Sequence, residues 1–186
     1  MTNRKAVVFA GLCVAINIVL GLSAKYLSVP FVFLDALGTI LGAVVYGPWI
    51  GGLIGLLTNV IIGIVFSPKE IPFALVNFWI GMLVGLVARR FRFTSTTAVL
   101  TGIVISITAP LIGTPIAIYL FGGLAGGTLD IFFLTLKQSG QSVFSAAFFP
   151  RVGENLIDKI ICCVLAVEIV RRAGLKSCYR GYREQK

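Results

Sequence analysis

The sequence contains no histidine and few charged residues. Only 12% of its 186 residues are charged and only seven are acidic, whereas soluble domains carry about 25% charged residues. Without imidazole, the chain lacks the commonest general base and metal ligand. No nucleophile motif and no phosphate-binding loop of the Walker type occurs. These absences argue against an enzyme, and we expect neither a metal nor a cofactor.

Cysteine is scarce as well, and its four positions show no metal-binding spacing. Cys13, Cys162 and Cys163 lie inside apolar runs, and Cys178 lies in the basic C-terminal segment. A free cysteine in an apolar environment behaves as a small hydrophobic residue. We therefore expect these residues to fill space between helices rather than to form disulfides or bind metal.

Apolar residues dominate what remains. They make up 58% of the chain, and the mean hydropathy is +0.99. A soluble fold of this length cannot hide so much apolar surface, but a lipid bilayer can solvate it. The 21 glycines fit this class, because membrane helices use small residues to approach one another closely.

Long apolar runs divide the chain into spans. They cover residues 6–23, about 31–46, 49–66, 71–88, about 96–121 and about 152–170. The stretch from Gly122 to Pro150 is predicted to be a long loop with a short interfacial or re-entrant helix near Leu129 to Leu136. The sequence thus predicts an all-α membrane protein. Six transmembrane helices form one bundle, residues 1–186 form a single domain, and a short extra helix lies between spans five and six.

The basic residues predict the orientation in the membrane. With six spans, eleven lysines and arginines fall on the side of the two termini and five on the other side. Positive charge stays in the cytoplasm, so both termini are predicted to be cytoplasmic. The net charge of +9 is accounted for by these span ends, and nucleic acid is not expected as a partner.

Two predicted spans carry small residues and one asparagine at a spacing of four. The third has Gly51, Gly55, Asn59 and Gly63, and the fourth has Asn77, Gly81 and Gly85. Residues four apart share one face of a helix. One interpretation is close helix packing with the asparagines as interhelical hydrogen-bond partners. The other is that both asparagines line an outward-facing cavity.

Charged residues gather at the start of the last span. Glu154 and Asp158 share one helix face, and so do Asn155 and Lys159. Polar groups in a bilayer are costly, so this group needs a reason. It is either an ion-pair cluster at the interface, with Lys159 reaching the surface, or a polar ligand site, which we favour. Asp35, followed one turn later by Thr39, begins the second run.

Three segments together match a known pattern. The first is Ala6-Val7-Val8-Phe9-Ala10. The second contains Leu34-Asp35, Gly38-Thr39 and Gly47-Pro48-Trp49 with the glycines that follow it. The third is Glu154 to Lys159. In this combination, and over nearly its whole length, the chain resembles the substrate-binding S components of energy-coupling factor (ECF) transporters. These proteins import vitamins and related micronutrients.

The resemblance implies a mechanism and partners. An S component of the bacterial cell membrane binds a small vitamin-like molecule on the outer side. It docks on a transmembrane coupling subunit that is joined to two ATPase subunits, and it topples in the bilayer to release its substrate inside. Ala6 and Ala10 would face the coupling subunit. The implied substrate contacts are Asn77, Glu154, Asn155, Asp158 and Lys159, followed by Asp35, Thr39, Asn59 and Trp79.

The sequence leaves the ligand open. The general pattern is nearest to the riboflavin-type group of S components, while cobalamin, thiamine precursors and queuosine precursors also fit. Two other functions fit the same features: a structural or sensory membrane module, for which glycine stripes serve equally well, and a proton-coupled carrier that works alone.

Overall fold

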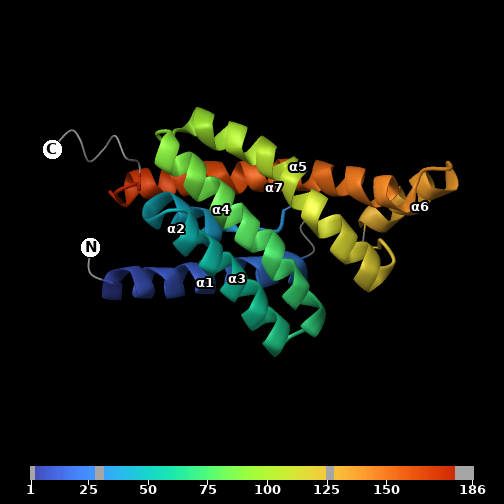
Figure 1. Ribbon diagram of the computed structural model, residues 1–186, viewed down its shortest axis with the longest axis horizontal. Helices are drawn as coiled ribbons and strands as arrows, with labels where there is room; N and C mark the ends of the chain where they lie inside the picture. Colours follow the sequence, from blue (N-terminus) through green and yellow to red (C-terminus); the bar gives the residue numbers. More distant parts are fainter. Residues whose placement is uncertain (1–2, 28–31, 125–127, 179–186) are drawn as a thin grey trace.

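The computed structural model describes residues 3–27, 32–124 and 128–178, which are almost entirely helical and contain no strand. Figure 1 shows the helices packed as one bundle. Their bounds are α1 Asn3–Tyr26, α2 Leu37–Tyr46, α3 Pro48–Val65, the 3₁₀ helix η1 Pro68–Phe73, α4 Ala74–Arg90, α5 Ser95–Phe121, α6 Thr128–Gln138 and α7 Val143–Arg172. The loop predicted near Pro30 and the basic residues Arg180, Arg183 and Lys186 lie outside the described residues.

Four candidate spans meet the length and hydropathy that a bilayer requires within the described part of the chain: α1, α3, η1 with α4, and α5. The second predicted span is shorter than its apolar run, because α2 has 10 residues and reaches only about 15 Å. A hydrocarbon core is about 30 Å thick. The all-helical class of the prediction is confirmed, and the count of six spans is not.

The region between α5 and the last helix differs from its predicted form. A short helix, α6, is present as expected, but α7 begins at Val143 rather than near Val152 and continues through Pro150. The proline that suggested a loop boundary therefore lies within a helix. Proline removes one helical hydrogen bond but is tolerated inside membrane proteins where neighbouring groups compensate. Figure 1 shows α6 folded back on the first turns of α7.

The basic residues at the start of α1, at the end of α4 and at the end of α7 lie at one end of the bundle, here called the basic end. Phe9 of α1 contacts the ring of Tyr46 at the end of α2, and the side chain of Arg89 covers Gly47 in the α2–α3 turn. After α7, the backbone N–H of Cys178 donates to the carbonyl of Val44 at 2.9 Å. The first turn of α1 and the last turn of α7 lie at this end in Figure 1. The grouping agrees with the charge asymmetry of the sequence.

The two small-residue stripes face each other across α3 and α4. Added methyl groups on Gly81 and Gly85 would collide with the backbones of Gly51 and Pro48, and one on Gly55 would collide with the backbone of Asn77. The two helix backbones therefore touch along most of their length. Helix α4 also packs against α2. The middle of α7 contacts the segment before α2.

Candidate functional site

A buried ion pair lies where α7 meets the segment that leads into α2. The ammonium of Lys159 is 2.5 Å from Oδ2 of Asp158 and 2.9 Å from Oδ1 of Asp35. The side chains of Lys159 and Asp158 are 4% and 0% exposed, while that of Asp35 is 47% exposed. Charges in such an environment persist only when they are paired. The arrangement joins two residues that are 124 positions apart in the sequence.

The second oxygen of Asp158 holds the backbone of the same segment. Its Oδ1 accepts hydrogen bonds from the N–H groups of Phe33 at 2.7 Å and Leu34 at 2.9 Å. Leu34 has a φ of 53°, a left-handed conformation that is uncommon for a leucine. The hydrogen bonds that Asp158 accepts offset the energetic cost of that conformation. Residues 32–36 are therefore fixed to α7 through one carboxylate.

One turn nearer the start of α7, fewer of the polar side-chain atoms have hydrogen-bond partners. Glu154 and Asn155 are half-buried, and the amide of Asn155 donates to the carbonyl of Arg151 at 2.8 Å. Within the described residues, the Glu154 carboxylate forms no ion pair or hydrogen bond. Glu154 lies in electrostatic range of Arg151 and Asp158. This turn therefore presents polar atoms that the chain itself does not satisfy.

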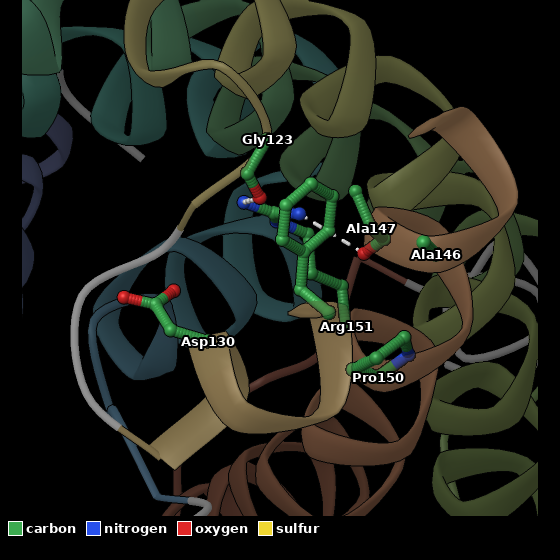
Figure 2. Close-up of a pocket in the computed structure, with 7 residues that line it drawn as sticks. Gly123, Asp130, Ala146, Ala147, Pro150 and Arg151 are labelled. Atoms are coloured by element: carbon green, nitrogen blue, oxygen red, sulfur yellow. Dashed lines mark hydrogen bonds between the residues drawn. The ribbon is translucent and has the colours of Figure 1, made fainter. Parts of the chain in front are cut away.

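Arg151 closes a small hollow between the end of α5, α6 and α7 (Figure 2). Its guanidinium donates to the carbonyls of Ala147 at 2.9 Å, Gly123 at 3.2 Å and Leu124 at 3.4 Å. The hollow is lined by Gly123, Asp130, Phe133, Ala146, Ala147, Pro150 and Arg151 and has about 150 Å³ of space including its mouth. Its interior has no room for the centre of a water-sized sphere, so the hollow alone does not hold a vitamin-sized molecule.

The two predicted asparagines form a pair between α3 and α4. The amide of Asn77 donates to Oδ1 of Asn59 at 3.0 Å, and the buried Oδ1 of Asn77 has no partner among the described residues. That oxygen lies close to Gly55. The geometry agrees with the packing interpretation of the stripes. A role of these asparagines as substrate contacts stays a prediction.

Thr39 belongs to a different polar network. The amide nitrogen of Asn17 donates to the hydroxyls of Thr39 at 2.9 Å and Thr58 at 3.1 Å, and the Gly38 N–H donates to Asn17 Oδ1 at 2.6 Å. The network joins α1, α2 and α3, and its side chains are buried. Sequence reasoning missed Asn17, although it is the only carboxamide in the first apolar run. Thr39 is therefore engaged in the packing of α1, α2 and α3.

Three further predicted residues lie at the surface of the bundle. Trp79 is exposed, and Ala6 and Ala10 are half-buried on α1. The most exposed face of α1 runs instead through Val7, Val8, Gly11, Leu12, Ala15 and Val19. The sequence prediction of Ala6 and Ala10 as docking residues stays untested, and the geometry adds Gly11 to the residues that a partner could reach.

One buried group was not singled out by sequence reasoning. Thr114 on α5 is fully buried, and its hydroxyl has no hydrogen-bond partner among the described residues. Buried hydroxyls nearly always have partners, so this one is available to a bound molecule. It lies in the half of α5 nearer α6, one residue before Pro115.

Comparison with known families decides the class of the protein. The family model described as "ECF transporter, substrate-specific component" matches residues 5–170. The chain belongs to this family. Searches of curated proteins and of solved structures found no match.

The match covers α1 to α7 and confirms the resemblance inferred from the three sequence segments. As an ECF substrate-specific component, the chain is a multi-pass membrane protein of a transport complex, in agreement with its apolar helices. The ion-pair cluster of Asp35, Lys159 and Asp158 thus lies, with the turn of Glu154 and Asn155, within a subunit of a substrate-binding family. This combination directs attention to the half of the bundle away from the basic end.

Proposed function

We propose that this chain is the high-affinity substrate-binding subunit of an ATP-driven ECF importer for a vitamin or related micronutrient. Family membership carries the proposal. The coupling subunit and two ATPase subunits supply energy, because no nucleotide-binding motif occurs in this chain. The protein lies in a bacterial cell membrane, crosses it six times and has both termini in the cytoplasm.

We place the substrate in the half of the bundle away from the basic end, between the middle of α7 and its neighbours. Glu154 and Asn155 offer unsatisfied acceptors there. Asp158 and Lys159 lie one turn deeper and are paired with each other and with the segment at Asp35. Their role in this proposal is to fix residues 32–36 beside the substrate.

A reporter fused after Lys186 tests the orientation. We expect a C-terminal fluorescent-protein fusion to be active and a C-terminal alkaline phosphatase fusion to be inactive, because basic residues collect at the end that holds both termini. A matched pair of fusions within the η1 region, after Ser67, is expected to give the opposite result. An active phosphatase after Lys186 would reject both the cytoplasmic C-terminus and the even number of spans.

A substitution on the open face of α1 tests the importer function. A methyl group added to Gly11 would have no packed neighbour within 4 Å, so Gly11→Trp adds bulk without disturbing the fold. We expect this variant to lose co-purification with the ATPase subunits and to lose uptake, because close helix contact depends on small residues. The double variant Ala6→Trp with Ala10→Trp is expected to act in the same way while retaining bound substrate.

The control for docking is Leu100→Trp, which places the same tryptophan side chain at an exposed position on α5. Mass spectrometry of the small molecule retained by the purified protein identifies the substrate in the same preparations. A wild-type protein that never associates with ATPase subunits would reject the importer function. It would favour a stand-alone carrier if uptake persisted and a structural module if it did not.

A further inference from the structure

The polar atoms left open near the middle of α7, at Glu154 and Asn155, are hydrogen-bond acceptors. In the described part of the chain, neither oxygen of Glu154 has a donor, and only the nitrogen of the Asn155 amide is engaged. Asp35 uses one oxygen for Lys159, and its half-exposed side chain leaves the other open. A molecule that binds here therefore meets carboxylate and amide oxygens.

The cations of the same region are already engaged. Lys159 is held between Asp158 and Asp35, and Arg151 donates to three backbone carbonyls. The ammonium of Lys137 lies 5.9 Å from the centre of the Phe133 ring. An anionic group would have to displace one of these contacts. A buried carboxylate that lost its cation would then be left unpaired, which is costly.

Helix geometry brings the open acceptors to one place. Glu154 and Asn155 each precede a member of the buried ion pair by one turn, so they lie about 6 Å from it along the axis of α7. Residues four apart share a face, and Lys159 on the face of Asn155 reaches Asp35. Glu154 and Asn155 therefore lie one helical turn before the ion-pair cluster that Asp35 joins.

We infer that the substrate carries a protonated amine or an amidine-like N–H group, which donates to Glu154 and Asn155. The inference rests on the proposed function and narrows its substrate class. A bound cation supplies the hydrogen-bond donor that Glu154 lacks among the described residues, and donors to a charged acceptor form the stronger hydrogen bonds. Among the candidates raised by the sequence, this favours amine-bearing precursors of the thiamine and queuosine kinds over neutral riboflavin and cobalamin.

Four defined probes test the class on the full-length protein in detergent. They are the thiamine precursor 4-amino-5-aminomethyl-2-methylpyrimidine, the queuosine precursor 7-aminomethyl-7-deazaguanine, riboflavin and biotin, with affinities measured by calorimetry. We expect at least one of the first two, which are cations, to bind more tightly than riboflavin, which is neutral, and biotin, which is an anion. Tighter binding of riboflavin or biotin, or no binding of either cation, would overturn the inference.

Glu154→Gln then tests the contact itself. The substitution keeps the size of the side chain and removes its charge, so affinity for the bound cation is expected to fall about 10- to 100-fold. Glu168→Gln, near the other end of α7, is the matched control and is expected to leave affinity unchanged. Equal affinities of Glu154→Gln and wild type would remove Glu154 from the site. Co-purification with ATPase subunits is scored separately, so the importer function can survive the loss of this inference.

Discussion

Lys159→Met is expected to destabilise the protein by about 3–5 kcal/mol, because removing one partner of a buried ion pair leaves the other charge uncompensated. The carboxylate left behind belongs to Asp158, which is fully buried and also holds the backbone N–H groups of Phe33 and Leu34. The loss therefore extends to the segment that enters α2. Thermal or denaturant unfolding of the purified protein in detergent measures the effect.

Arg172→Met is the matched control for this prediction. Arg172 also pairs with a carboxylate, that of Glu168 at 3.5 Å, but its side chain is 85% exposed. Exposed pairs contribute about 0–1 kcal/mol, so little change is expected. Replacing Asp158 by asparagine in the Lys159→Met background removes the stranded charge and is expected to restore part of the stability. A loss below about 1 kcal/mol for Lys159→Met alone would contradict the ion-pair interpretation.

Gly81→Leu is expected to disrupt the contact between α3 and α4 and to lower the free energy of unfolding by more than about 3 kcal/mol. Small insertions into a packed core cost about 1–3 kcal/mol, and the cost is larger when backbones are forced apart. Any side chain at Gly81 meets the backbone of Gly51 and Gly52 rather than a movable side chain, so relief requires the helices to separate. We expect Gly81→Ala to lower the free energy of unfolding by about 1–3 kcal/mol. We expect Gly81→Leu to reduce the yield of folded protein.

The control glycine for this experiment is Gly153 in α7, where an added methyl group would have no packed neighbour within 4 Å. Alanine is favoured over glycine in helices by up to about 1 kcal/mol, so Gly153→Ala is expected to be neutral or stabilising. Unfolding midpoints of the alanine variants give the comparison. Similar midpoints for Gly81→Ala and Gly153→Ala would show that the small-residue stripe does not determine how closely α3 and α4 approach.

The sequence by itself determined the class of the protein. Apolar runs are incompatible with water, so their number and length indicate a helical membrane bundle, and basic residues at the run ends mark one end of it. The repeat of small residues four apart predicted close helix faces, since this spacing is a property of every α-helix. The match of the family to residues 5–170 agrees with the three segments on which the resemblance was based.

Only the tertiary structure decided which polar residues meet. Asp35 and Lys159 are far apart in the sequence, and no local pattern shows that a loop before α2 reaches α7. The same holds for Asn17, which meets Thr39 and Thr58 because α1, α2 and α3 pack together. Periodicity reports which residues share a face of one helix, whereas partners across helices depend on how the backbones cross. For this reason the sequence predicted the charged turn of α7, and the fold showed which of its groups are already paired.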